Sequence, residues 1–227
     1  MAPTNQPLNL HESRMLKECG WVATQHKAND ADAFERAVLS LGQFLGTPTT
    51  TRNRRLVDRL TPTHADKARP NSLSRMSGTG QQPWHMDMAY RVEPARYLVM
   101  GMHECPARTA DTELLNASTL VPADLSEEAL SEPFLIRTGA RSFYATIKAK
   151  GAPFVRFDPG CMQGSTARAR ALMQQLLNRT LAPTHFHQWT PGAVLVIDNW
   201  KMFHRRADAT GSTNRTLYRV SVMGGTT

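Results

Sequence analysis

The sequence has few cysteines and no pattern that pairs them. Its 227 residues include only Cys19, Cys105 and Cys161, which are widely spaced and form no CxxC zinc motif. An odd number of distant cysteines argues against a disulfide framework. We expect three reduced thiols, mostly buried.

The sequence also lacks an apolar run long enough to cross a bilayer. Its first residues, MAPTNQ, contain no apolar core of the kind that a signal peptide needs. These absences predict a soluble cytoplasmic protein with no membrane partner.

Several common catalytic and binding motifs are missing too. No Walker phosphate loop, GxGxxG turn or serine nucleophile elbow occurs. The net charge is +8 and the pI is near 9.9, but the arginines are scattered and do not alternate with aromatic residues. This scatter favours a solvated basic surface and makes nucleic-acid binding a weak alternative. It adds modest support for an anionic substrate.

The residues that are present suffice for one domain. A hydrophobic fraction of 41% and four tryptophans can form a sizeable core, and no long linker divides the chain. We therefore predict a single domain over residues 1–227. Its N-terminal part, about residues 1–45, is expected to be helical. Within it, residues 31–45 place apolar side chains at helical spacing, with Asp30 or Asp32 as the cap.

The remaining chain alternates between polar stretches and short strands. Residues 47–83 are polar, basic and rich in Thr, Ser, Gly and Pro, which predicts a long flap with a short element near residues 54–60. Residues 193–197 predict a strand buried on both faces, and residues 167–179 predict a helix capped by Ser165 or Thr166. Further strands are expected at residues 95–104, 133–138, 184–189 and 216–222.

This pattern predicts a mainly β fold with flanking helices. Short strands joined by turns suggest a double-stranded β-helix, or jelly roll, with the helices covering one sheet. Such a barrel holds a small site in its mouth.

Two distant motifs carry candidate metal ligands. In the WHMD motif of residues 84–87, His85 and Asp87 are two residues apart, so an extended segment points both to the same side. His204 lies far downstream, beyond the apolar strand. Two imidazoles and one carboxylate can occupy one face of an octahedral Fe(II) and leave three positions open, as in non-haem iron oxygenases. His85, Asp87 and His204 are therefore candidate catalytic residues and metal ligands.

The order of these motifs resembles the taurine dioxygenase/clavaminate synthase-like superfamily of Fe(II)/2-oxoglutarate-dependent oxygenases. The family pattern is W-H-x-D, a D-T segment, G-x-x-x-x-x-D-N, then H-R and two arginines near the C-terminus. The resemblance covers roughly residues 75–222 and depends on the ordered combination of its parts. The matching positions are residues 84–87, Asp111-Thr112, residues 192–199, His204-Arg205, Arg215 and Arg219.

The resemblance implies a role for each matched side chain. The two histidines and the aspartate would hold iron. Arg215 would bind the distal carboxylate of 2-oxoglutarate, and Thr112 would hydrogen-bond a carboxylate of the same cosubstrate. Arg219 would lie near the keto-acid end or bind a substrate anion. Because Asp87 is present where related halogenases have a small residue, halogenation is disfavoured.

Simple chemistry supports an arginine as the anchor. A planar guanidinium binds a carboxylate through two parallel charge-assisted hydrogen bonds, which lysine cannot imitate. On a strand, Arg215 and Arg219 would share a face with Leu217, while Tyr218 and Val220 would lie on the other. The pattern by itself leaves open which face is interior.

Other candidates have plain structural alternatives. Arg156 could meet a substrate carboxylate or form a structural pair with Asp158. Gln82 could touch substrate or simply belong to a polar loop. His185 and His187 have a chelating spacing, but no third ligand is evident, and a role as strand-surface or hydrogen-bonded histidines is favoured.

Taken together, the residues and the resemblance predict an oxidoreductase. Its cofactor would be Fe(II), with 2-oxoglutarate and O2 as cosubstrates and succinate and CO2 as coproducts. It would oxidise an unactivated C–H bond of a small polar molecule of amino-acid or natural-product type, with hydroxylation favoured over desaturation or cyclisation. The alternative is a jelly-roll protein that binds metal and ligand without turnover.

Overall fold

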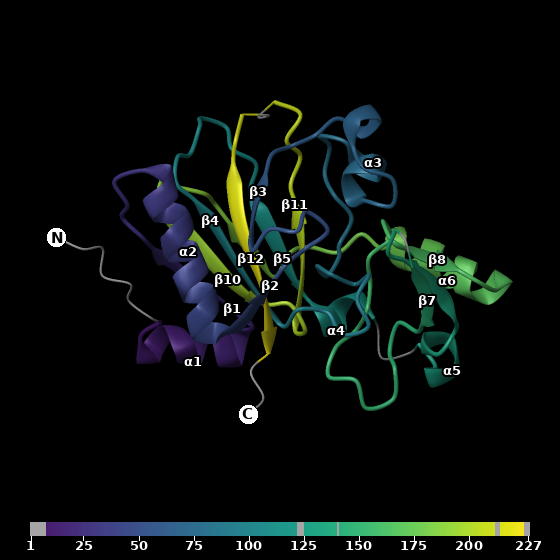
Figure 1. Ribbon diagram of the computed structural model, residues 1–227. Helices are drawn as coiled ribbons and strands as arrows, with labels where there is room; N and C mark the ends of the chain where they lie inside the picture. The colour runs from purple at the N-terminus through teal and green to yellow at the C-terminus, as the bar shows by residue number, and fades with distance from the viewer. Residues whose placement is uncertain (1–7, 122–124, 140, 212–213, 225–227) are drawn as a thin grey trace.

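The computed structural model describes residues 8–121, 125–139, 141–211 and 214–224. Residues 1–7 of the expected N-terminal part lie outside this range. The described chain is mainly β, with antiparallel sheets and flanking helices, as predicted. Figure 1 shows two helices beside the large sheet at one side of the molecule and a group of smaller elements at the other.

The largest sheet has six strands in the order β1-β10-β4-β12-β2, with β3 also paired to β12. All pairings in it are antiparallel. Strand β10 is buried along its whole length, which confirms the prediction for residues 193–197. The strands are β1 (Trp21–Gln25), β2 (Gly46–Thr49), β3 (Val57–Leu60), β4 (Tyr97–Met102), β10 (Ala193–Asp198) and β12 (Leu217–Gly224).

Helices α1 (Leu10–Cys19) and α2 (Ala31–Leu45) cover one face of this sheet (Figure 1). Helix α2 begins after Asp30, whose side chain accepts a hydrogen bond from the Ala33 amide and confirms the predicted cap. Its apolar side buries Phe34 and Val38 against the sheet. The contact is so close that a Cβ on Gly101 of β4 would lie 2.8 Å from a methyl group of Val38.

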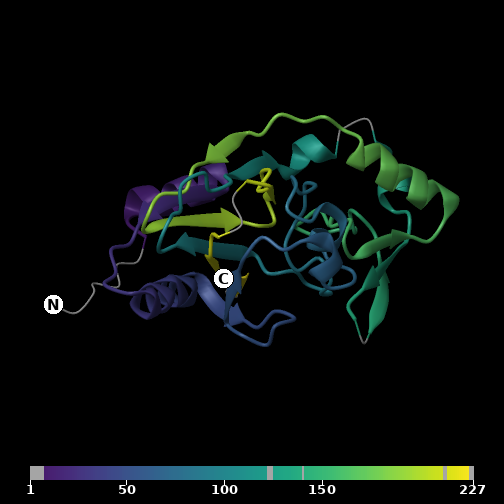
Figure 2. The same ribbon diagram turned by 90° about the horizontal axis from the view of Figure 1, so that it is seen from above.

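A second sheet packs on the opposite face. It has the order β11-β5-β9, and its buried side chains share one apolar cluster with those of β4, β10 and β12. Figure 2 shows these strands from above. The cluster includes Leu98, Met100, Leu114, Leu195 and Met202. The strands are β5 (Thr112–Asn116), β9 (His185–His187) and β11 (Met202–Arg206).

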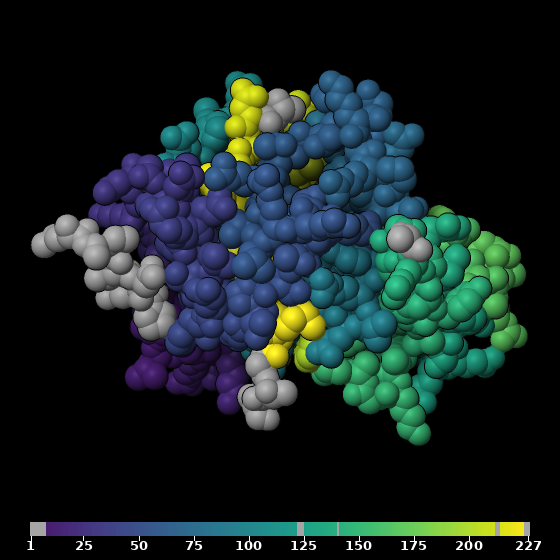
Figure 3. All heavy atoms as spheres, viewed as in Figure 1, coloured from purple at the N-terminus to yellow at the C-terminus, as the bar shows by residue number. Residues whose placement is uncertain are grey.

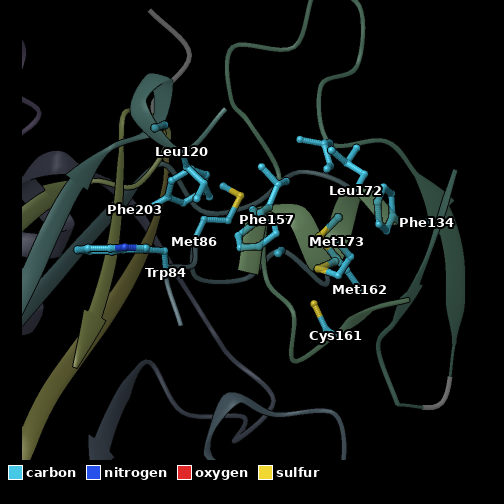
Figure 4. Packing of buried hydrophobic residues seen from close by; sticks show 14 of the residues in the cluster. Trp84, Met86, Leu120, Phe134, Phe157, Cys161, Met162, Leu172, Met173 and Phe203 are labelled. Atoms are coloured by element: carbon cyan, nitrogen blue, oxygen red, sulfur yellow. The ribbon is translucent and has the colours of Figure 1, made fainter. Parts of the chain in front are cut away.

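A third, smaller sheet lies at the far end from the N-terminal helices (Figures 1 and 2). Its order is β7-β6-β8, and the helix predicted for residues 167–179 packs on it as α6, capped by Thr166. Figure 4 shows its core, in which Met86 and Phe203 meet Phe157. The apolar cluster that packs against this sheet therefore extends to the segment that carries the WHMD motif. The elements are β6 (Phe134–Arg137), β7 (Ser142–Ala145), β8 (Met162–Gly164), α4 (Ala117–Leu120), α5 (Glu127–Leu130) and α6 (Ala167–Leu177).

The predicted flap contains more regular structure than the sequence indicated. The short element expected near residues 54–60 is strand β3, but β2 was missed, as were a short 3₁₀ turn (Ala65–Lys67) and helix α3 (Leu73–Ser77). In the space-filling view this segment, in blue, covers the middle of one face (Figure 3). None of the described helices is long and apolar enough to cross a membrane.

Candidate metal centre

Two histidines from distant parts of the sequence are joined by backbone hydrogen bonds. His85 and His204 form an isolated antiparallel β-bridge, in which the His85 amide donates to the His204 carbonyl at 3.2 Å and the reverse bond is 3.0 Å. His204 belongs to β11 of the second sheet. Direct backbone pairing therefore brings the imidazole rings together, with centroids 4.3 Å apart.

Asp87 completes the cluster. Its carboxylate oxygens lie 3.9 Å from His85 Nε2 and 3.8 Å from His204 Nε2. One potential donor atom from each of the three side chains lies within 4.8 Å of the others, and all three residues are buried. Among the described residues, this is the one group of three or more His, Cys, Asp or Glu side chains placed to hold a metal ion.

The protonation of the histidines suits metal binding. His85 Nδ1 lies 3.0 Å from the Pro83 carbonyl, so a proton on Nδ1 leaves the Nε2 lone pair facing the cluster. Burial, followed by repulsion from His85, lowers the pKa of His204 to about 3. A neutral imidazole is the form that binds a metal. The donor set, two imidazoles and a carboxylate, therefore fits Fe(II).

Asn199, which follows strand β10, holds the backbone of Asp87 through hydrogen bonds. Asn199 Oδ1 accepts from the Asp87 amide at 2.9 Å, and Asn199 Nδ2 donates to the carbonyls of Asp87 and Ala95 at 3.1 and 2.8 Å. The residue after Asp87, Met88, has a φ of 58°, a left-handed conformation that is costly for this side chain. Met86 and Met88, on either side of Asp87, are both buried.

Arg219 binds the carboxylate of Asp87. Its Nη1 donates to Asp87 Oδ2 at 2.7 Å, and its Nη2 donates to Asp58 Oδ2 at 2.9 Å. Burial alone would raise the pKa of Asp87, but Arg219 and the two histidines lower it. Burial likewise opposes the charge of Arg219, yet the two carboxylates raise its pKa. The sequence analysis expected Arg219 to bind a keto acid or a substrate anion. In the structure it binds the carboxylates of Asp87 and Asp58.

A cavity of about 290 Å³ opens beside the cluster. Besides the three candidate ligands, its walls include Thr112, Gln82, Arg215 and Arg219, which the sequence had singled out. Leu217 and Arg219 thus lie on the face of β12 that lines the cavity, whereas Tyr218 and Val220 on the other face are buried under helix α2. Arg215 itself precedes the strand, which begins at Leu217, so the two arginines do not share one continuous strand as expected.

Arg215 is a buried cation, only 5% exposed. Its Nη1 donates to the Ala110 carbonyl at 2.5 Å, while its Nε has no partner, and no carboxylate of the described residues lies within ion-pair distance. Burial, with the nearby Arg206, lowers the pKa of Arg215 to about 10. The guanidinium therefore remains charged near neutral pH on the cavity wall, and although Asp111 raises its pKa, no carboxylate of the described residues forms an ion pair with it.

Thr112 is held on the cavity wall by Trp189, whose indole Nε1 donates to the Thr112 hydroxyl at 3.1 Å. The hydroxyl accepts this bond, so its own proton is available to an acceptor in the cavity. Gln82 also lines the cavity, and its side-chain oxygen accepts from the Arg206 amide at 3.4 Å.

Arg156 does not belong to this cavity, which corrects the expectation of a substrate contact. Its guanidinium is buried and donates to the backbone carbonyls of Ala89, Arg91 and Val92. It does not pair with Asp158 either. These bonds anchor the chain that follows the WHMD motif.

Asp158, two positions after Arg156, was not identified as a site residue from the sequence. Asp158 lines the cavity, and burial raises its pKa. It accepts from the Gly160 amide at 2.8 Å and from the Cys161 thiol at 3.3 Å, and no cationic side chain of the described residues forms an ion pair with it. The sequence indicated the segment that contains Arg156 and Asp158. It did not show which of these two charged side chains lines the cavity.

The second histidine pair has structural contacts instead of a metal-binding arrangement. His185 stacks on Trp21 with ring centroids 3.7 Å apart, and His187 packs edge-on against Trp189 at 4.4 Å. The pair is absent from the metal-binding group found among the described residues. The non-metal interpretation of His185 and His187 is therefore the one the structure favours.

Comparisons with known proteins agree with the geometry. The family model described as taurine catabolism dioxygenase TauD, TfdA family, matches residues 132–221. The expected resemblance is confirmed. The match spans β6 to most of β12 and includes His204, Arg215 and Arg219. No curated protein matches the chain in sequence.

Solved structures of oxygenases share the fold. An asparagine oxygenase in complex with Fe(II), 3-hydroxyasparagine and succinate has a TM-score of 0.72 at 17% identity, covering 94% of this chain and 78% of that one. A taurine dioxygenase from Burkholderia xenovorans has a TM-score of 0.66 at 17% identity, covering 97% and 84%. The non-haem iron oxygenase OrfP in complex with Fe and α-ketoglutaric acid has a TM-score of 0.66 at 18% identity, covering 94% and 78%.

Proposed function

We propose that the protein is an Fe(II)- and 2-oxoglutarate-dependent oxygenase that acts on a small polar substrate. One observation carries this proposal. A buried group of two imidazoles and one carboxylate lines the same cavity as a buried arginine, Arg215, that has no carboxylate partner among the described residues. A metal and an anionic cosubstrate would complement these two features together.

His85, Asp87 and His204 would hold the iron. When bound together with 2-oxoglutarate and O2, iron supplies the oxidant for an unactivated C–H bond, and 2-oxoglutarate is converted to succinate and CO2. The chain positions the reactants and excludes water. The apolar packing of Trp84 and Met86 behind the ligands keeps solvent from that side.

Arg215 and Thr112 would bind the cosubstrate. A buried guanidinium without a counterion is costly, and a carboxylate that neutralises it through parallel hydrogen bonds removes that cost. The free hydroxyl proton of Thr112 would donate to a carboxylate oxygen. Both residues lie on the wall that also carries the candidate ligands, so one dicarboxylate could contact both the arginine and the metal side of the cavity.

Asp158 supports a substrate that carries hydrogen-bond donors. It is a half-buried carboxylate on the cavity wall, without an ion-pair partner among the described residues. An ammonium, amide or guanidinium group would satisfy its oxygens. Related structures hold hydroxyasparagine and hydroxyarginine, which supports an amino acid or a natural-product intermediate of similar polarity. Hydroxylation is the reaction we favour over desaturation or cyclisation.

The same proposal includes the fold and extent of the protein. The two facing antiparallel sheets, with His204 on one and Arg219 on the other, suit a double-stranded β-helix. We infer that residues 1–227 form one domain built around this barrel. The cytoplasmic location expected from the sequence stays a prediction.

The first experiment adds Fe(II) and 2-oxoglutarate to the metal-free protein without oxygen. A weak visible charge-transfer band from the chelated keto acid is expected, and His85→Ala should abolish it. Iron binding without the band would reject the oxygenase assignment and favour a non-catalytic protein that binds metal and ligand. Arg168→Ala, at an exposed pair with Glu128, is the matched control and should keep the band.

A further inference from the structure

An acidic residue behind the cavity is tied to the candidate metal ligand through one arginine. Asp58 lies on β3, and its register partner on the neighbouring strand β12 is Arg219. Asp58 is 1% exposed and lies in the short element that the sequence predicted within the flap. No motif of the sequence had pointed to this residue.

Each carboxylate oxygen of Asp58 has a separate set of partners. Oδ1 accepts from the Thr51 hydroxyl at 2.9 Å and from Asn53 Nδ2 at 2.8 Å, both in the loop before β3. Oδ2 accepts from Arg219 Nη2 at 2.9 Å. Since Arg219 Nη1 binds Asp87 Oδ2 at 2.7 Å, an unbroken series of hydrogen bonds runs from the loop to the candidate ligand.

We propose that Asp58 is a positioning residue that restrains Arg219 so that Asp87 stays available to the metal, and that couples the loop of residues 50–55 to the metal centre. This inference rests on the proposed metal site. It concerns a residue outside the cavity wall, because Asp58 is not among the residues that line it.

The first reason is geometric. A guanidinium presents its N–H groups as a planar fork and prefers to bind one carboxylate through two parallel bonds. Asp58 occupies Nη2, so Arg219 reaches Asp87 with Nη1 at one oxygen only. Without Asp58 the fork would be free to turn both nitrogens onto Asp87. Both oxygens would then be occupied, and a metal would have to displace one of these bonds.

The second reason is the charge. The group Asp58, Arg219 and Asp87 holds two carboxylates and one guanidinium, so it keeps a net negative charge beside the two histidines. If Asp58 became neutral, Arg219 would cancel the charge of Asp87. A divalent cation would then be attracted less strongly to a buried site, where charge interactions are screened weakly.

The test is a Co(II) titration of the metal-free protein, followed by visible absorption without any cosubstrate. Asp58→Asn is nearly isosteric and keeps an acceptor for Thr51 and Asn53. We expect it to weaken Co(II) binding about 10-fold, the lower end of the effect of removing a direct partner of a metal ligand, because Asp58 acts through Arg219. The matched control is Asp32→Asn, which removes an exposed pair with Arg59 on the outer side of the same strand and should change binding less than about twofold.

Hydrogen exchange measures the coupling. The Arg54 amide donates to the Thr51 carbonyl at 3.0 Å, and the Asn53 amide donates to the Thr51 hydroxyl at 3.2 Å. Co(II) should slow the exchange of these amides in the wild-type protein and not in Asp58→Asn. If Asp58→Asn does not fold, Asn53→Ala serves instead. It leaves the Asp58–Arg219 pair intact, so it should retain Co(II) affinity while losing most of the metal-dependent protection at Arg54.

The outcomes separate this inference from the proposed function. If the wild-type protein binds Co(II) and Asp58→Asn binds it equally well, the positioning role is wrong and the metal site stands. Unchanged exchange of the loop on metal binding would reject the coupling. If the wild-type protein itself binds no Co(II), both the inference and the metal site fall.

Discussion

Replacing Arg215 with methionine is expected to separate cosubstrate binding from folding. The two side chains have similar length, but methionine carries no charge. In the folded protein, Arg215 loses its solvent and receives one hydrogen-bond acceptor, the Ala110 carbonyl, in return. Its lowered pKa, about 10, reflects the same cost of burial. Removing this cation should therefore leave the ligand-free protein as stable as the wild type, or more stable.

Arg215→Met should greatly lower the affinity for 2-oxoglutarate. A charge-assisted hydrogen bond contributes about 1.5–3 kcal/mol. The loss of a two-bond contact, discounted for water that enters the space, is then roughly 3 kcal/mol, or about a hundredfold in affinity. At a concentration of 100 times the wild-type dissociation constant, bound cosubstrate stabilises the fold by about 2.7 kcal/mol. In Arg215→Met the same concentration should contribute only about 0.4 kcal/mol.

Thermal unfolding with Co(II) present, with and without 2-oxoglutarate, measures both quantities. For a chain of this size, 1 kcal/mol corresponds to about 2–4 °C in Tm. The wild-type protein should gain roughly 5–10 °C on adding the cosubstrate, and Arg215→Met about 1 °C. Arg168→Met, at an exposed ion pair, is the control and should behave like the wild type. A full cosubstrate-dependent shift in Arg215→Met would refute the anchor role, and a large loss of stability without ligand would refute the burial argument.

Three further predictions concern the frame around the site. Asn199→Ala should weaken Co(II) binding and lower the free energy of unfolding by about 2–4 kcal/mol, because three buried hydrogen bonds to Asp87 and Ala95 are lost; equal metal affinity in a titration would contradict this. The metal-free protein should lose stability as the pH falls from about 6.5 toward 3. The reason is that His204 stays neutral in the folded protein, where its pKa is about 3, but takes up a proton in the unfolded chain. In urea unfolding, His204→Gln should therefore show a free energy of unfolding that depends less on pH. Gly101→Ala should destabilise the fold by about 1–3 kcal/mol because its Cβ would lie 2.8 Å from a Val38 methyl group, whereas Gly211→Ala, with no atom within 4 Å, should leave the urea midpoint nearly unchanged.

Local patterns in the sequence were reliable where one strong signal dominated. Helix α2 has a full apolar face and a capping aspartate, and β10 is an uninterrupted apolar run, so both could be located within a residue or two. The weaker strands β1, β5 and β11 were not predicted. They are short, and pairing with strands distant in the sequence stabilises them more than their own composition does.

The candidate ligands themselves could be found from residue type and order. A histidine and an aspartate two positions apart, with a second histidine near a family-like arginine pair, pointed to His85, Asp87 and His204 without any structure. Ligand chemistry restricts which side chains can serve, and that restriction is visible in the sequence. The comparisons support the class of protein that this pattern suggested.

Only the tertiary structure decided which charged side chains face the cavity and what each one binds. In the fold, Asp158 lines the cavity, whereas Arg156 binds backbone carbonyls, although the two residues lie on one short segment. It also placed Asp58 opposite Arg219 through the register of two strands that are far apart in the chain. A charged residue looks the same in the sequence whether it is solvated, paired or left for a ligand. The packing of distant elements around it determines its solvation and its partners, and this packing is not encoded in any local pattern.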